Sequence, residues 1–295
     1  MLKNLEELLE LAKGRKATVS LAGGEDIEAL KALKEAKEKG IVDDVIVVGN
    51  GKKSRKNLEE VGVDFKLIET SSDVETAEKA VKEVSSGNAQ VLMKGLIKTS
   101  VLLKAVLNKE WGLRTGKLLS HVILAHSPHV DRVFFITDGG MVIRPNLEQK
   151  VQIINNAVEV AHKLGYEKPK VALIAAVEVV NPDMPETLEA AVIAKMADRG
   201  QIKGAIIDGP FGVDNAMSEW AANVKGVKGE VAGHADILVV PDIHSGNFLG
   251  KSFVYVGGGT IAGIVVGAKA PIVIVSRADT ARSKFMSLAL AVAVH

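Results

Sequence analysis

The segment 272–284, IVIVSRADTARSK, joins an apolar run to a group of basic and hydroxyl side chains. Ser276 and Arg277 directly follow the apolar residues. Further polar residues come within the next seven positions, namely Arg282, Ser283 and Lys284. Arginine binds phosphate in a bidentate geometry, and hydroxyl and backbone N–H groups can donate to the remaining oxygens. Basic residues at a helix start oppose the helix dipole, and a bound anion would explain them. The segment therefore predicts a phosphate site, and the alternative is a solvated, capped helix start.

A second basic group lies in the segment 94–100, KGLIKTS. Lys94 ends an apolar run, and Lys98 precedes Thr99 and Ser100, which could cap a helix. The simpler interpretation is an ordinary helix start. We favour an anion site because two separate basic groups suit a ligand that carries several phosphates.

A third polar group, PDIHSGNFLGKSF (241–253), follows the apolar run ILVV. Three residues separate Gly246 from Gly250, whereas a nucleotide-binding P-loop needs four, so a nucleotide triphosphatase is rejected. What remains is a polar turn that contains Asn247 and leads to Lys251. Helix capping by Asp242 or Ser245 explains the turn about equally well.

The glycine-rich stretch 255–277 lacks the acidic residue that a dinucleotide site needs after its glycines. We expect instead a glycine-rich helix, in which Gly263 and Gly267 allow close packing of two backbones. Asp183 and Glu186 stand at a predicted helix start, where capping accounts for them.

Three further segments carry acidic or imidazole side chains. Asp138 and Asp208 end predicted strands as turn residues or ligand contacts. The segment 126–131, HSPHVD, could ligate a metal, but its proline predicts a turn and no second ligand cluster accompanies it.

Short apolar runs alternate with segments of helical period, which is typical of βα units building a parallel sheet. Ligands bind at the carboxyl ends of the strands in such sheets, where the polar groups stand. The predicted strands are 17–21, 45–49, 65–69, 90–95, 121–126, 132–140, 170–178, 204–210, 236–242 and 271–275. Predicted helices follow 17–21, begin near Asp73 and Thr99, span 146–164 and 185–199, and end the chain. Two strands close in sequence, 121–126 and 132–136, break the alternation and indicate a change of domain.

Composition excludes several classes of protein. The chain has 295 residues, of which 47% are hydrophobic and 25% charged, with a formal net charge of +1. The balanced charge gives no electrostatic attraction that would bind nucleic acid non-specifically. The absence of cysteine excludes a thiolate metal site and a cysteine nucleophile. Lys269 and Pro271 interrupt the longest apolar stretch, and the amphipathic N-terminus does not resemble a secretory signal. We therefore expect a cytoplasmic protein that does not enter a membrane.

Motifs along the whole chain resemble the phosphate acetyl/butyryltransferase family, and its butyryl members most. They are LAGGED, MKGLIKTS, GLRTGKLLSHV, FFITDGGM, EVVNPDMPET, DGPFGVDNA, GHADILVVPDIHSGN, GKSFVY and GAKAPIVIVSRADTARSK. The resemblance implies two α/β/α domains with a cleft between them, as in isocitrate and isopropylmalate dehydrogenases, and a homodimer or higher homo-oligomer. It also implies that the C-terminal helix returns to the first domain. We accordingly expect one domain at 1–128 with 275–295 and a second at 129–274.

The resemblance also implies a reaction, acyl-CoA + phosphate ⇌ acyl phosphate + CoA, with coenzyme A as substrate and no metal or nicotinamide. The family's Ser-Arg pair corresponds to Ser276 and Arg277, and its asparagine turn to Asn247 with Lys251 following. The remaining cofactor-binding candidates are Lys94, Lys98, Thr99, Ser100, Arg282 and Ser283. Ser283 stands where acetyltransferases carry an aspartate proposed to deprotonate the CoA thiol. Asp279 lies one helical turn before that position.

With no cysteine available, a thioester intermediate on the protein is excluded, which favours direct transfer in a ternary complex. Butyryl is the expected acyl group, although the sequence does not determine chain length. The alternatives are a phosphate acetyltransferase, a decarboxylating dehydrogenase of the same fold, and a catalytically silent acyl-CoA binding protein.

Overall fold

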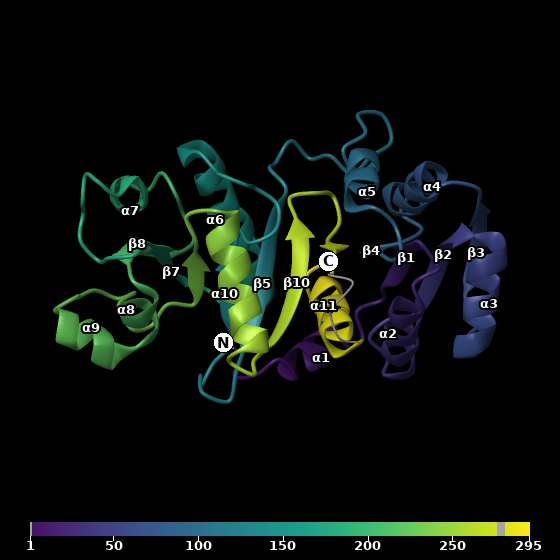
Figure 1. The fold of residues 1–295 in the computed structure, drawn as a ribbon, viewed down its shortest axis with the longest axis horizontal. Helices are drawn as coiled ribbons and strands as arrows, with labels where there is room; N and C mark the ends of the chain where they lie inside the picture. The colour runs from purple at the N-terminus through teal and green to yellow at the C-terminus, as the bar shows by residue number, and fades with distance from the viewer. Residues whose placement is uncertain (1, 276–280) are drawn as a thin grey trace. The chain divides into compact units, whose positions relative to one another are not determined.

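The computed structural model describes residues 2–275 and 281–295, and its contacts divide the chain into two compact units. Unit 1 comprises residues 1–4 and Leu118–Ile261, and unit 2 comprises Leu5–Lys117 and Ala262–His295. Each unit is an α/β structure with helices on both faces of its strands (Figure 1). Within the described ranges, no helix combines the length and the apolar character needed to cross a membrane. The domain bounds expected from the sequence stay a prediction.

Unit 2 is built on six strands in the order β3-β2-β1-β4-β11-β10. Their bounds are β1 Thr18–Ala22, β2 Asp44–Asn50, β3 Lys66–Thr70, β4 Val91–Lys94, β10 Thr260–Val266 and β11 Ile272–Val273. All neighbouring pairs are parallel except β10 with β11. The first four strands coincide with strands predicted from the sequence. The first two residues of β10 belong to unit 1 by the same division of contacts.

The helices of unit 2 lie on both faces of this sheet (Figure 1). They are α1 Glu7–Ala12, α2 Ile27–Glu38, α3 Gly51–Val61, α4 Asp73–Ser85, α5 Thr99–Val106 and α11 Ala281–Ala293. Every residue of α11 from Lys284 to Ala293 is buried, because the helix packs on α1 and α2. A helix that is apolar on all sides is stable only inside a protein. The rest of unit 2 therefore determines where the start of α11 lies.

Unit 1 carries a sheet in the order β5-β6-β9-β7-β8. Its strands are β5 Ser120–His126, β6 Phe134–Thr137, β7 Lys170–Ile174, β8 Ile206–Phe211 and β9 Ile237–Val239. Only β5 with β6 is antiparallel, which agrees with the break in alternation predicted there. Its helices are α6 Leu147–Lys163, α7 Pro185–Asp198, α8 Val213–Met217, α9 Glu219–Lys225 and α10 Ile243–Tyr255.

Alternating side chains of β6 contact segments on opposite faces of this sheet. Phe134 packs edge-to-face on Phe253 of α10, with ring centroids 5.3 Å apart. Its neighbour Phe135 points to the other face and makes a similar contact, also at 5.3 Å, with Tyr166. Successive residues of a strand face opposite sides, so one apolar run can anchor both layers. The β6 strand thereby holds α10 on the sheet.

Two glycines allow the start of α10 to touch the loop that follows β6. A Cβ atom on Gly246 would lie 2.6 Å from the Cα of Gly139 and 3.0 Å from the carbonyl oxygen of Asp138. These are backbone atoms, which cannot move aside without shifting the loop. Glycine is therefore required at this contact for space.

The structure corrects three predictions. The segment expected to be a glycine-rich helix is strand β10 instead, because its apolar residues TIAGIVV pair in a sheet. Asp183 and Glu186 do not cap α7, whose N-cap is Met184 without a side-chain hydrogen bond. Thr99 and Ser100 do not cap α5 either, since its N-cap is Lys98 and both residues lie inside the first turn.

We predict that Gly246→Ala destabilises unit 1, because the added methyl group collides with the backbone at Gly139. The expected cost is about 1–3 kcal/mol in the free energy of unfolding, measured by urea denaturation. Gly250→Ala, four residues along the same helix, is the matched control because its Cβ would meet only Ile123 Cδ1 at 3.4 Å. Equal stability of the two variants would contradict the proposed collision.

A second prediction concerns Asp236, which precedes β9 and accepts a hydrogen bond from the Lys170 N–H at 2.8 Å. Burial raises the pKa of Asp236 above its ordinary value. The folded protein then holds this proton at a pH where the unfolded chain has lost it, so stability falls as pH rises through that window. Asp236→Asn removes this dependence.

The Asp236→Asn variant should therefore gain stability relative to the wild type as pH rises from about 4 towards neutrality. Urea denaturation of both proteins at a series of pH values measures the difference. A difference that stays constant with pH would show that the Asp236 carboxyl does not titrate differently in the folded protein.

Candidate functional site

The loop after β6 in unit 1 is organised by the buried carboxylate of Asp138. Its Oδ1 accepts from the Gly140 and Met141 N–H groups at 2.8 and 2.9 Å, and its Oδ2 accepts from the Val142 N–H at 3.1 Å. Charge-assisted bonds to backbone N–H groups are strong, and three on one carboxylate leave the loop little freedom. These hydrogen bonds support the role of Asp138 as a turn residue, and not its alternative role as a ligand contact.

The start of α10 lies against this loop. Asp242 is the N-cap, and it accepts from the Ser245 N–H at 2.8 Å and from the Ser245 hydroxyl at 2.9 Å. Burial acts to raise the pKa of Asp242, but the Ser245 donors outweigh it and the pKa lies below its ordinary value. Asn247 donates from Nδ2 to the Gly139 carbonyl at 3.4 Å. Helix capping is thus confirmed for Asp242, and Asn247 lies at the carboxyl end of β6.

Lys251 and His244 occupy exposed positions on the same helix. Lys251 lies one turn beyond Asn247. The His244 ring centroid lies 6.1 Å from that of the exposed Phe248. Lys251 therefore offers an accessible cation near the asparagine.

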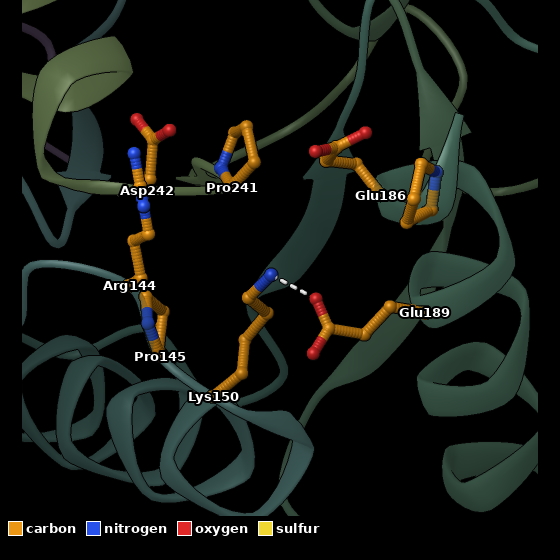
Figure 2. Close-up of a pocket in the computed structure, with 8 residues that line it drawn as sticks. Arg144, Pro145, Lys150, Glu186, Glu189, Pro241 and Asp242 are labelled. Atoms are coloured by element: carbon orange, nitrogen blue, oxygen red, sulfur yellow. Dashed lines mark hydrogen bonds and ion pairs between the residues drawn. The ribbon is translucent and has the colours of Figure 1, made fainter. Parts of the chain in front are cut away.

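A pocket of about 330 Å³ lies where α6, α7 and α10 begin (Figure 2). Lys150 of α6 is buried and forms an ion pair with Glu189 of α7. Figure 2 shows the Lys150 ammonium pointing into the hollow between Arg144 and Glu186. Sequence reasoning missed this group, because its residues come from separate segments and form no recognisable motif. The walls are completed by Pro145, Pro185, Pro241 and Asp242.

A polar network lies beyond β7 and β8. Lys225 forms ion pairs with Glu178 at 3.1 Å and Asp214 at 2.9 Å, and these bonds lower the pKa of both carboxyls. Asn215 donates to Glu178 at 3.1 Å. Burial raises the pKa of Asp208 in β8. Asp208 accepts from the adjacent Gly209 N–H at 2.8 Å, and the other acids are bonded to Lys225 or Asn215, so the network is held together by its own residues.

In unit 2, the loops after β1 and β4 touch closely. A Cβ on Gly23 would lie 2.7 Å from the Leu96 nitrogen, and Gly23 has φ +101°, a conformation that favours glycine. Asp26 in the first loop caps α2 by accepting from the Ala29 N–H at 3.0 Å. The close approach joins the two loops at the carboxyl end of the sheet.

The basic segment 94–100 lies at this same end of unit 2. Lys94 is buried at the end of β4, with Nζ 3.3 Å from the Gly95 carbonyl oxygen. Lys98, Thr99 and Ser100 are exposed at the start of α5. These three residues are accessible to a ligand, whereas Lys94 is available only in part.

Two of the cations in the opening segment have partners inside unit 2. Arg282 forms an ion pair with Glu6 of the N-terminal segment. Lys284 is buried and lies 3.5 Å from the Asp26 carboxylate. The Ser283 carbonyl accepts from the Ser287 hydroxyl at 2.8 Å. Carboxylates already lie beside both Arg282 and Lys284, so these two basic residues do not require a bound anion.

Ser276, Arg277 and Asp279 lie outside the described residues. The candidate residues are divided between the units: Asn247 and Lys251 belong to unit 1, and Lys94, Lys98, Thr99, Ser100, Arg282 and Ser283 to unit 2. Among the residues that the structure describes, no group of three or more His, Asp or Glu side chains is placed to hold a metal ion.

Comparison with known proteins identifies the relatives of this chain. The family described as "Phosphate acetyl/butaryl transferase" matches residues 4–83 and 71–292. Phosphate butyryltransferase of Clostridium acetobutylicum is 45% identical over 298 residues, covering 100% of this chain and 99% of the relative. Phosphate acetyltransferase of Thermotoga maritima is 43% identical, covering 97% of this chain and 98% of the relative.

Solved structures give the same result. A branched-chain phosphotransacylase from Enterococcus faecalis has a TM-score of 0.85 and 38% identity, covering 95% of this chain and 99% of its own. A 4-hydroxythreonine-4-phosphate dehydrogenase from Klebsiella pneumoniae, at 14% identity and a TM-score of 0.56 over 94% of this chain and 99% of its own, shares the fold alone. The predicted dehydrogenase-like α/β fold class is confirmed. The chain belongs to the phosphate acetyl/butyryl transferase family.

Proposed function

We propose that this protein transfers a short-chain acyl group between coenzyme A and inorganic phosphate. The observation that carries the proposal is the 45% identity, over the whole chain, to a relative named phosphate butyryltransferase. Identity at this level along the full length supports a shared reaction more strongly than any single motif. A phosphate acetyltransferase, at 43% identity, supports the same chemistry with a different acyl group.

In the proposed site, Ser276 and Arg277 hold the phosphate together with Asn247 and Lys251. A guanidinium and an ammonium would stabilise the charge that develops on the phosphate and carbonyl oxygens. The exposure of Lys251 and the position of Asn247 at the carboxyl end of β6 support this assignment.

Coenzyme A is proposed to contact the basic segment of unit 2. Lys98, Thr99 and Ser100 are exposed there, and Lys94 stands at the end of the adjoining strand. Arg282 and Ser283 are weaker candidates, because the Arg282 guanidinium pairs with Glu6 and the Ser283 carbonyl bonds Ser287. Each of these residues would place the coenzyme for reaction rather than take part in bond making.

The reaction follows as a direct transfer. An oxygen of the hydrogenphosphate ion attacks the thioester carbonyl, the carbon–sulfur bond breaks, and the proton of the hydrogenphosphate passes to the thiolate to give free coenzyme A. The absence of cysteine from the chain excludes a thioester intermediate on a protein cysteine. Most of the acceleration would then come from positioning the two substrates and stabilising charge.

Butyryl is the acyl group we propose, and acetyl is the alternative. Identities of 45% and 43% to the two kinds of relative do not discriminate between them. Each methylene of the acyl chain contributes about 0.8 kcal/mol when buried, so a pocket deeper by a few methylenes decides the preference. We further propose a cytoplasmic homodimer or higher homo-oligomer with two domains, at 1–128 with 275–295 and at 129–274.

The test is to mix the protein with phosphate and each of acetyl-, propionyl-, butyryl- and branched acyl-CoA, and to follow release of free thiol. We expect release that depends on phosphate and is fastest with butyryl-CoA. Saturable CoA binding without release from any substrate would favour a silent binding protein. Reduction of NAD with a hydroxy-diacid would favour a dehydrogenase.

Arg277→Ala should lower kcat by about 10²–10³-fold, because one charged donor to the reacting oxygens is lost. Thermal unfolding should match that of the wild type. Arg199→Ala, at the exposed end of α7, is the control and should retain full activity. Near wild-type turnover in Arg277→Ala would remove this arginine from the proposed mechanism.

A further inference from the structure

The imidazole of His121 lies at the end of the unit 1 sheet that also carries Asn247. His121 is the second residue of β5, which runs antiparallel to β6. The register of this pair places His121 opposite Asp138, the first residue after β6. The Thr137 hydroxyl donates to the His121 carbonyl at 2.8 Å and supports this position. A titratable side chain therefore lies at the carboxyl end of β6.

The His121 side chain points to the face of the sheet that α10 covers. Successive residues of a strand face opposite sides, so His121 and Ile123 share a face. Ile123 Cδ1 lies 3.4 Å from the position of a Cβ atom on Gly250 of α10, and the helix packs on both β5 and β6 (Figure 1). Because Asn247 and Lys251 belong to α10, the imidazole lies on the same side of the sheet as both residues.

The loop after β6 connects the imidazole to the asparagine. A Cβ atom on Gly140 would lie 2.8 Å from His121 Nδ1 and 3.0 Å from Cγ, so the ring rests against this glycine. Asn247 Nδ2 donates to the carbonyl of the preceding residue, Gly139, at 3.4 Å. Asp138 accepts from the Gly140 N–H at 2.8 Å and holds the loop in place. The imidazole and the amide thus contact adjacent residues of one loop.

The orientation of the ring leaves one nitrogen for a substrate. Nδ1 is buried against Gly140, whereas His121 as a whole is only partly buried. Nε2 is therefore the ring nitrogen that can meet a ligand. An imidazole exchanges protons readily near neutral pH, so it can act as a base and an acid in turn.

The transfer reaction needs such a group because one proton changes place. Hydrogenphosphate loses the proton when its oxygen bonds to the acyl carbon, and the coenzyme sulfur gains it when the carbon–sulfur bond breaks. An amide such as that of Asn247 does not exchange a proton with a substrate. An ammonium such as that of Lys251 has no lone pair with which to accept one. The imidazole beside them can do both.

We propose that His121 is the acid–base residue of the transfer. Nε2 takes the proton of hydrogenphosphate as the phosphate oxygen bonds to the acyl carbon. The imidazolium then gives this proton to the coenzyme sulfur as the carbon–sulfur bond breaks. In the reverse direction the ring takes the thiol proton and gives it to the departing phosphate oxygen. The inference rests on the proposed function, because it assigns the proton carrier of that reaction.

The first experiment follows thiol release from butyryl-CoA in the presence of phosphate. His121→Gln should lower kcat by about 10²–10⁴-fold, because an amide cannot carry the proton. The KM values for both substrates should stay close to those of the wild type. His234→Gln is the matched control and should retain full activity, since its imidazole is exposed and pairs with Glu219 at 3.2 Å. Wild-type kcat in His121→Gln, or a loss confined to KM, would overturn the assignment.

Chemical rescue separates proton transfer from support of the fold. Added imidazole should restore part of the kcat that His121→Ala loses, and substituted imidazoles should do so in the order of their basicity. The wild type and His234→Gln should not respond. A loss of activity that no imidazole restores would contradict a role in proton transfer.

Gly140→Ala tests the same assignment while the imidazole is present. The added methyl group would lie 2.8 Å from Nδ1, so the ring must move. We expect kcat to fall by about 10–100-fold, because a small displacement of a reacting group is costly. In the His121→Gln background the same change should have little further effect on kcat. Additive effects of the two substitutions would show that Gly140 does not act through the imidazole and would overturn the proposal.

Two outcomes distinguish failure of this inference from failure of the proposed function. No phosphate-dependent thiol release by the wild type, with any acyl-CoA, would overturn the transferase and the role of His121 together. Equal turnover by the wild type and His121→Gln would overturn the role of His121 alone and leave the transferase in place.

Discussion

The geometry at the carboxyl end of unit 1 depends on the hydrogen bonds that the buried Asp138 carboxylate accepts. Three backbone N–H groups converge on this carboxylate, so the loop after β6 has a single arrangement. That arrangement brings Gly139 against Gly246 and lets Asn247 reach the Gly139 carbonyl. Both the asparagine and the cap of α10 are placed as a result. In this role the Asp138 carboxylate fixes the position of the loop and is not a reacting group.

Buried lysines form a second constraint. Lys150 in unit 1 and Lys284 in unit 2 are both buried, and each lies beside one carboxylate, Glu189 or Asp26. Burying a charge is costly unless it is paired, and breaking such a pair costs more than forming it contributes. Lys284 connects the first turn of α11 to the loop that caps α2, so it serves the fold. Lys150 differs because its ammonium also faces a pocket that Arg144 lines (Figure 2).

Several features could be predicted from the sequence because they depend on neighbours along the chain. Apolar runs predicted the strands β1 to β9. The sequence also predicted Asp242 as a possible cap, and its carboxylate accepts from the Ser245 N–H three residues later. The periodicity of TIAGIVV in β10 led to a wrong prediction, because this segment is compatible with either a helix or a strand. Its pairing with β11 determines that it is a strand. The prediction that Asp183 caps α7 was wrong, because the helix begins two residues later, at Pro185.

The sequence by itself determined the α/β class, the order of the elements, the family resemblance and the position of polar groups after strands. These follow from periodicity and from motifs of contiguous residues. Only the tertiary structure decided which charges are already balanced and which remain available. Glu6 and Arg282 are 276 positions apart, and Asp26 and Lys284 are 258 positions apart, so no local pattern links either pair. The pocket lined by Arg144, Lys150 and Glu186 could not be predicted for the same reason. The helices α6, α7 and α10, which begin at this pocket, come together only when the sheet forms.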